Sequence, residues 1–245
     1  MTSEPVPEPT SPPADPAGSD RARALRPPAD AAEAEALQRE LAPLVERADR
    51  LGEVRLVAGV DVGYAVSGDA LCAGIAVLDA ATLEVVETVV HEDVARFPYV
   101  PGLFSFRELP PLLAAFEALE RRPDLVVCDG QGIAHPRRFG LACHLGLALD
   151  LPAIGCAKSL YVGEAGEPGA ARGAHAPIVH GGETVGAALR MQDGVRPVYV
   201  SVGHRVSLGT AIARTLALGP RYRQPETTRA ADSLVRAALK RRAGR

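Results

Sequence analysis

Three apolar runs typical of β-strands follow one another from residue 53, and they constrain the fold more than any other part of the chain. They read EVRLVAGVDVGYA (53–65), ALCAGIAVLDA (70–80) and LEVVETVVH (83–91). Only VSGD and AT connect them, and connections this short suit β-hairpins. The sequence therefore predicts an antiparallel meander of three strands.

An alternation of strand, helix and strand comes later in the chain. DLVVCD (124–129) is typical of a buried strand, RRFGLACHLGLALD (137–150) of a helix, and PAIGCAK (152–158) of a second buried strand. Such an alternation indicates a right-handed parallel crossover. Three antiparallel strands followed by parallel strands with helices between them is the order of a ribonuclease H-like fold. We therefore expect an α/β protein whose mixed sheet has strands 1–3 antiparallel and strands 4–5 parallel, flanked by helices.

Shorter patterns complete the expected elements. Residues 31–51, rich in Ala, Glu, Leu and Arg, predict an N-terminal helix. LPPLLAAFEALERR (109–122) has helical apolar spacing, and Pro110 and Pro111 are tolerated if they lie in the first turn. Further strands are expected at 183–190 and 197–202, and further helices at 207–218 and 227–243.

The first 30 residues differ in composition from the rest. They hold eight of the 21 prolines and almost no large apolar side chains, so they cannot bury enough surface to offset the entropy of ordering. We predict a disordered tail over 1–30, dispensable for stability and activity, and a single domain over 31–245. With no signal-peptide segment and no apolar run of roughly 18 residues, the chain is expected to be cytoplasmic and to have no membrane partner.

Cysteines and charge narrow the expected environment and partners. Cys72, Cys128, Cys143 and Cys156 have no C-x-x-C spacing and lie among apolar residues, which favours reduced, buried thiols over disulfides or a zinc site. The net charge is only −3, yet residues 214–245 hold nine Arg or Lys against two acidic residues. That local excess of positive charge attracts polyanions, although a solvated helix face would show the same pattern.

Two carboxylates occupy unusual positions. Asp61 lies inside the apolar run LVAGVDVGYA, and Asp129 directly follows LVVC at a strand end. Burying a carboxylate there is costly unless it is paired, hydrogen-bonded or bound to a cation. Either residue alone is equally well explained by local backbone hydrogen bonds. Together, and with Glu108 near, they favour a site for a hard cation such as Mg²⁺ or Mn²⁺.

Four segments carry a resemblance to a known family. VAGVDVGYA, FPYVPGLFSFRE, VVCDGQGIAHPRRFGLACHLGL and IGCAKS together, in this order, resemble endonuclease V, the repair nuclease of deaminated bases. The resemblance runs from about residue 35 to PETTRAADSL near the C-terminus. It implies a ribonuclease H-like endonuclease V domain in a monomer. It also implies Mg²⁺-dependent hydrolysis of the second phosphodiester bond on the 3′ side of a deoxyinosine in DNA, with inosine-containing RNA as the other candidate substrate.

By the same resemblance, individual residues acquire expected roles. Asp61, Glu108 and Asp129 would bind the metal, and Asp232 would complete the catalytic site. Lys158 and His135 would hold the phosphate and the nucleophilic water. From the residues alone, Lys158 also reads as a surface lysine and His135 as a structural histidine beside proline. Ser105 and Glu108 also fit a helix capping box.

The stretch FPYVPGLFSFRELP (97–110) is expected to recognise the lesion. Its prolines stiffen the backbone, so that Pro98, Tyr99, Val100 and Pro101 would form a wedge entering the duplex when a base is extruded. Gly102, Phe104 and Gly130 would line the pocket for that base, since glycine permits close approach. The alternative is a proline-rich connection whose aromatic side chains pack in the core.

Two other functions fit parts of the sequence. GVDVGYA with DGQG also resembles the phosphate-binding elements of actin-like kinases and ATPases, which transfer phosphoryl groups from a Mg-nucleotide. A noncatalytic module that only binds the lesion is the second alternative. The full set of carboxylates argues against it, and the chain is too short for the duplicated domain of the kinases.

Overall fold

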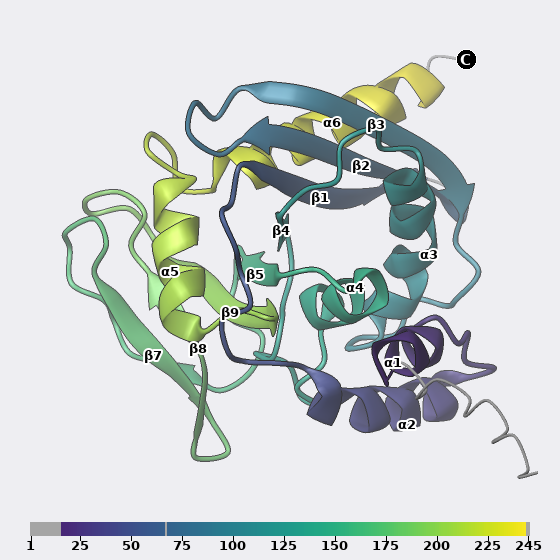
Figure 1. Ribbon diagram of the computed structural model, residues 1–245, viewed down its shortest axis with the longest axis horizontal. Helices are drawn as coiled ribbons and strands as arrows, with labels where there is room; N and C mark the ends of the chain where they lie inside the picture. The colour runs from purple at the N-terminus through teal and green to yellow at the C-terminus, as the bar shows by residue number, and fades with distance from the viewer. Residues whose placement is uncertain (1–15, 67, 244–245) are drawn as a thin grey trace, which may run out of the picture.

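The computed structural model describes residues 16–66 and 68–243 (Figure 1). Its centre is a mixed sheet with the strand order β3-β2-β1-β4-β5-β9-β8-β7-β6. The strands are β1 (Leu56–Tyr64), β2 (Ala70–Asp79), β3 (Val85–Val94), β4 (Leu125–Cys128), β5 (Ala153–Ala157), β6 (Glu164–Ala165), β7 (His175–His180), β8 (Glu183–Leu189) and β9 (Val198–His204). The helices are α1 (Pro16–Ala24), α2 (Ala31–Leu41), the 3₁₀ turn η1 (Ala42–Leu44), α3 (Phe104–Glu117), α4 (Leu141–Leu149), α5 (Leu208–Ala217) and α6 (Glu226–Ala243).

The predicted mixed sheet is confirmed at its core. β1, β2 and β3 pair antiparallel, with Asp61 opposite Gly74, whereas β4 pairs parallel with β1, and β5 pairs parallel with β4. β4 is buried along its whole length, as expected where helices cover both faces of a sheet. The order β3-β2-β1-β4-β5 with these directions is that of a ribonuclease H-like fold.

Antiparallel strands extend the sheet beyond β5. β9 pairs with β5, and β8, β7 and β6 follow outward. β8 and β9 match the strands expected near 183–190 and 197–202. β7 is not predicted by the sequence pattern, because it contains Pro177 and alternating exposed residues and lies near the sheet edge.

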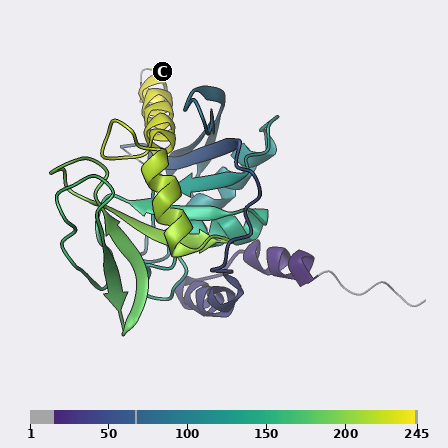
Figure 2. The same cartoon turned by 60° about the vertical axis from the view of Figure 1, so that its left-hand side comes forward.

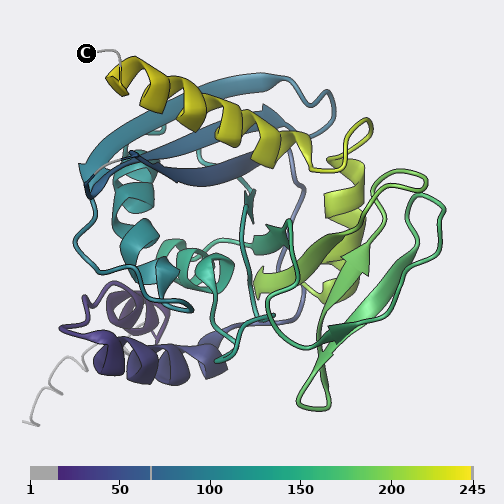
Figure 3. The same ribbon diagram turned by 180° about the vertical axis from the view of Figure 1, so that it is seen from behind.

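Helices cover the two faces of the sheet. Gly63 of β1 faces Val235 of α6, whereas the next residue, Tyr64, bonds to Glu108 of α3. Successive side chains of a strand point to opposite faces, so α6 and α3 lie on opposite sides, and α4 packs beside α3. Figure 3 shows α6 across β1 and β2, and Figure 2 shows α1 and α2 at the opposite end of the molecule from α6. No helix in the described part of the chain is long and apolar enough to cross a membrane.

α3 begins earlier than the sequence predicts. It starts at Phe104, so Pro110 and Pro111 lie inside the helix instead of in its first turn. Each proline removes one backbone hydrogen bond. The buried side chains of Leu109 and Leu112 stabilise the helix through packing, which the local pattern does not reveal.

The predicted disordered tail does not extend to residue 30. Residues 1–15 lie outside the described residues, but α1 occupies 16–24 and packs on α4. Ala24 is buried, and its carbonyl accepts a hydrogen bond from His144 Nε2 at 2.8 Å. Asp30 then caps α2 by accepting from the Glu33 N–H. The segment is ordered because α4 offers it a partner surface.

Deleting residues 1–30 is therefore expected to lower the free energy of unfolding by about 1 to 3 kcal/mol, through lost apolar burial and loss of the acceptor for His144. Deleting only 1–15 is the control, and we expect it to leave the stability unchanged. Urea unfolding of the full chain and both deletions measures the difference. Equal stabilities for all three proteins would show that α1 contributes nothing.

Candidate active site

Asp61, Asp129 and Asp232 bring negative charge to one place. Asp61 lies in β1, and Asp129 directly follows β4, where its N–H donates to the Val60 carbonyl at 3.3 Å. Asp232 comes from α6, where it also pairs with Arg236 at 3.0 Å. Burial, together with the charges of Asp129 and Asp232, raises the pKa of Asp61 to about 6. The three elements therefore converge on an acidic centre.

Glu108 reaches this centre from α3. Its Oε1 accepts a hydrogen bond from the Tyr64 hydroxyl at 2.9 Å, and the Arg107 guanidinium lies 5.0 Å from the centre of the Tyr64 ring. Burial raises the pKa of Glu108 to about 7, and the charges of Asp61 and Asp129 act in the same direction. Tyr64 thus fixes the orientation of a carboxylate that is costly to ionise.

The capping box considered for Glu108 is not formed. Leu103 is the N-cap of α3 and makes no side-chain cap hydrogen bond. The buried hydroxyl of Ser105 has no hydrogen-bond partner among the described residues. Because Glu108 bonds to Tyr64 instead, its side chain is held toward the acidic centre.

Lys158 follows β5 and supplies a positive charge. Its Nζ lies 2.5 Å from Asp129 Oδ2. Partial burial lowers the pKa of Lys158, but the hydrogen bond and charge of Asp129 outweigh it and raise the pKa overall. Arg223 donates to the Lys158 carbonyl at 2.6 Å and so braces this loop. Lys158 is thus a protonated group in direct contact with a candidate metal ligand.

The carboxylates are not closely clustered as in a preformed metal-binding site. Over residues 16–66 and 68–243, no group of three or more His, Cys, Asp or Glu side chains is arranged to hold a metal ion as the side chains lie. The ammonium of Lys158 stands beside Asp129 instead. The arrangement thus combines a strongly acidic centre with neutralising cations, Lys158 beside Asp129 and Arg236 beside Asp232.

A cavity of about 330 Å³ adjoins these groups, within the size range of small-ligand sites. Glu108, Asp129 and Lys158 line one part of it. Also in its wall are all three residues expected to surround an extruded base, Gly102, Phe104 and Gly130. The structure therefore joins the expected base pocket and the carboxylates in one cavity.

A tight turn forms part of the cavity wall. The Leu103 N–H donates to the Val100 carbonyl at 3.0 Å, and Pro101 and Gly102 occupy the two central positions, with Gly102 at φ 83°. Proline followed by a residue with positive φ is the pattern of a type II turn, which strongly favours glycine at the second position. Pro101 and Gly102 are therefore the residue types that this turn favours at its two central positions.

Tyr99 projects from the segment before the turn. Its side chain is 68% exposed, and its ring centre lies 4.7 Å from that of Phe104. Pro98 and Pro101 are also exposed, whereas Val100 packs against the core. Of the four residues expected to form a wedge, Val100 therefore has a packing role, and the alternative of core packing does not describe Tyr99.

His135 supports the turn from the wall of the cavity that Glu108 and Asp129 also line. It is buried, its Nε2 lies 2.9 Å from the Gly102 carbonyl oxygen, and its Nδ1 accepts from the Arg137 N–H at 3.2 Å. Burial, with the charge of Arg137, lowers the pKa of His135 to about 4. A neutral imidazole with both ring nitrogens engaged acts as a structural clamp here.

Three residues of the site are not predicted by the sequence pattern: Gln38, Tyr64 and Tyr161. Tyr161 lines the cavity with a ring centre 5.7 Å from that of His135, and its sequence neighbours give no signal. For Gln38 a sequence signal existed, because it occupies a buried position in α2 with the spacing of Ala34, Leu37 and Leu41. A polar residue on an apolar helix face requires a hydrogen-bond partner.

The basic C-terminal region is partly neutralised within the protein. Arg245 lies outside the described residues. Ion pairs along α6 join Arg229 to Glu226 at 3.0 Å, Arg236 to Asp232 at 3.0 Å and Arg242 to Glu92 at 3.1 Å. The local excess of positive charge is therefore smaller in effect than the residue count indicates.

Carboxylates on the central strands of a ribonuclease H-like sheet, with a lysine beside them, place the protein among the nucleases that hydrolyse phosphodiesters. Comparison with known proteins identifies the family. The family model described as Endonuclease V matches residues 39–233, and the chain belongs to the endonuclease V family. The predicted family and the prediction of an enzyme are confirmed.

Similar proteins cover most of the chain. Endonuclease V of Roseiflexus sp. strain RS-1 is 54% identical over 208 residues, which are 85% of this chain and 93% of that protein. The crystal structure of endonuclease V from Streptomyces avermitilis is 52% identical and has a TM-score of 0.85, covering 89% of this chain and 96% of the other. A Ciona intestinalis endonuclease V, crystallised with DNA containing an inosine, is 27% identical with a TM-score of 0.78, covering 86% and 98%.

Proposed function

We propose that the protein is a metal-dependent endodeoxyribonuclease that recognises deoxyinosine in DNA and initiates its repair. It hydrolyses the second phosphodiester bond on the 3′ side of the lesion. The observation that carries this proposal is the single cavity lined both by Glu108, Asp129 and Lys158 and by Gly102, Phe104 and Gly130. The related Ciona intestinalis enzyme, crystallised with a DNA that contains an inosine followed by a ribo-adenosine, supports the choice of an inosine-containing DNA.

The donor set fits Mg²⁺ or Mn²⁺. Asp61, Glu108 and Asp129 offer only carboxylate oxygens, the ligands that these hard cations prefer, and Asp232 adds charge from α6. The raised pKa values of Asp61 and Glu108 show that burial and crowding of negative charge oppose ionisation, an effect that a divalent cation would offset. When bound, it would make hydroxide available at neutral pH and stabilise the departing 3′ oxygen.

The chain's own residues complete the chemistry. Tyr64 orients Glu108, and Lys158, held protonated by Asp129, acts as a point charge toward the phosphate. We assign His135 to holding the Gly102 turn and not to the phosphate, because both of its ring nitrogens are engaged. Tyr99 enters the duplex while the base occupies the cavity.

A nicking assay tests the proposal. A duplex with one deoxyinosine, labelled at the 5′ end of the lesion strand, is incubated with enzyme and Mg²⁺, Mn²⁺ or EDTA. We expect one product, which ends one nucleotide 3′ of the lesion, with either metal and no product with EDTA or with the matched undamaged duplex. Cleavage of both duplexes at equal rates, or cleavage in EDTA, would contradict the proposal. The same assay with inosine-containing RNA identifies the preferred nucleic acid.

Tyr99→Ala is expected to weaken binding to the inosine duplex by about 1 to 3 kcal/mol, the scale of one aromatic stacking contact. Because the side chain is largely exposed, the melting temperature should change little. The defect should shrink on single-stranded inosine DNA, where no partner strand is held apart. Fluorescence anisotropy measures the affinity for both substrates. Tyr99→Phe, which keeps the ring, is the control. A stability loss of about 3 to 5 kcal/mol would identify Tyr99 as a core residue instead.

The family assignment removes the two alternatives drawn from the sequence. A chain that belongs to the endonuclease V family over residues 39–233 is neither an actin-like nucleotide phosphotransferase nor a noncatalytic binding module. We place the enzyme in the cytoplasm as a monomer. Its cysteines are free and buried, as expected in a reducing compartment.

A further inference from the structure

The carbonyl oxygen of Gly102 is surrounded by three hydrogen-bond donors. Gln38 Nε2 lies at 3.0 Å, His135 Nε2 at 2.9 Å and Arg137 Nη2 at 3.1 Å. A carbonyl oxygen has two lone pairs, so three donors saturate it. This carbonyl belongs to the type II turn that separates the exposed Tyr99 from the cavity, and its position therefore sets the shape of the cavity wall.

Gln38 holds the turn through a fully engaged side chain. It is 0% exposed, and the amide nitrogen that bonds to Gly102 also donates to the Phe139 carbonyl at 3.1 Å. Its Oε1 accepts from Arg137 Nε. Arginine is only a donor, so this contact fixes which amide atom is oxygen. Gln38 therefore bridges the turn and the 135–140 loop, both of which line the cavity.

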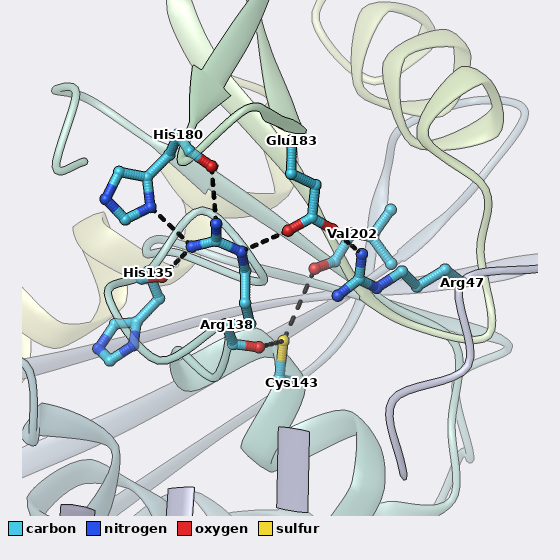
Figure 4. Close-up of polar contacts among 7 residues, drawn as sticks. All are labelled: Arg47, His135, Arg138, Cys143, His180, Glu183 and Val202. Atoms are coloured by element: carbon cyan, nitrogen blue, oxygen red, sulfur yellow. Dashed lines mark hydrogen bonds and ion pairs between the residues drawn. The ribbon is translucent and has the colours of Figure 1, made fainter. Parts of the chain in front are cut away.

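Hydrogen bonds of Arg138 hold the 135–140 loop, which Gln38 contacts, in place (Figure 4). Arg138 has φ 57°, and its guanidinium donates to Glu183 at 2.7 Å, to the His180 carbonyl at 2.8 Å and to the His135 carbonyl at 3.1 Å. Glu183 is also paired with Arg47. The β7–β8 turn thus anchors the loop, and a change at Gln38 would move the Gly102 turn more readily than the loop.

We propose that Gln38 is a positioning residue for lesion recognition, which acts through the Gly102 carbonyl to fix the pocket wall. The proposal rests on the proposed function and extends it to α2, since Gln38 directly precedes the residues 39–233 that match the family model. Small displacements of a binding wall are costly when a base must fit closely. α2 is therefore part of the recognition site and not an accessory to the fold.

Two substitutions separate the donor role from packing. Gln38→Met keeps the volume and removes all polar contacts, whereas Gln38→Glu keeps the size and an acceptor for Arg137 but removes the donors to Gly102 and Phe139. Glu35→Gln is the matched control, because Glu35 lies on the same helix and pairs with Arg137 at 3.3 Å without bonding to Gly102. We measure dissociation constants for an inosine duplex and for the matched undamaged duplex, with single-turnover nicking and thermal melting.

Both Gln38 variants are expected to lower the ratio of affinity for lesion DNA to affinity for undamaged DNA about 10-fold, the scale of one buried hydrogen bond. Their affinity for undamaged DNA should stay unchanged. The Glu35→Gln control should keep the affinity ratio of the unmodified enzyme. The ratio does not depend on the fraction of folded protein, so a merely structural role would lower the melting temperature and leave the ratio intact. Normal discrimination by Gln38→Glu, or by both variants, would overturn the proposal. Failure of the unmodified enzyme to nick the inosine duplex would instead overturn the proposed function.

Discussion

Asp61→Asn and Asp129→Asn are each expected to reduce Mg²⁺-dependent nicking of an inosine duplex at least about 1,000-fold, because each removes a charge needed to hold the cation and its hydroxide. Lesion binding should persist, since the cavity wall at Gly102 and Phe104 does not depend on that charge. Single-turnover rates and anisotropy in the absence of divalent cations measure the two effects. Glu117→Gln, an exposed carboxylate on α3, is the control.

The thermal stability of Asp61→Asn provides a second test. The pKa of Asp61 is raised to about 6 from an ordinary value of 3.8, so its ionisation destabilises the folded state as pH rises between these values. The asparagine side chain that replaces it carries no charge at any of these pH values. Asp61→Asn should therefore melt at an equal or higher temperature than the unmodified enzyme at pH 8 without metal. Retained nicking, or a marked loss of stability, would contradict the assignment of Asp61 to the acidic centre.

Gly59→Ala is expected to destabilise the protein by about 3 kcal/mol or more, since overpacking typically costs about 1 to 3 kcal/mol and this contact is with backbone. A Cβ at residue 59 would lie 2.0 Å from the carbonyl oxygen of Thr227 on α6. The Thr227 oxygen is a backbone atom and the position of Cβ is fixed by its own backbone, so no side-chain rotation relieves the clash. α6 must shift away from β1, and it carries Asp232 toward solvent as it does so. Cleavage should therefore fall together with stability.

Urea unfolding and nicking rates test this expectation. Gly52→Ala is the matched control, because a Cβ there meets no atom within 4 Å and the residue does not have positive φ. We expect the control to be neutral in both assays. A melting temperature for Gly59→Ala within about 2 °C of the unmodified protein would show that α6 is not held against β1 as closely as the structure has it.

The local sequence pattern determined the central sheet and the placement of two carboxylates. Hydrophobic runs with short connections indicate paired strands, and a carboxylate within or directly after such a run must lie on a central strand. Asp61 and Asp129 could therefore each be placed in or at the end of a central strand from sequence alone, whereas the pairing of β1 with β4 came from the structure. The PG pair of residues 101 and 102 is a local turn signal of the same kind, because proline restricts φ and glycine tolerates the positive φ that the next position needs.

Only the tertiary structure decided which distant residues meet. Gln38 lies 64 residues from the Gly102 carbonyl that it holds, and Tyr64 lies 44 residues from Glu108. Such contacts leave no local pattern, since they depend on how helices pack on the sheet. For the same reason the sequence predicts disorder for the segment that forms α1, because its packing on α4 is a tertiary contact. The sequence also predicts Pro110 and Pro111 at a helix start, whereas packing stabilises them inside α3. The central strands follow from neighbours in the chain, whereas α1, the start of α3 and the geometry of the candidate site follow from neighbours in space.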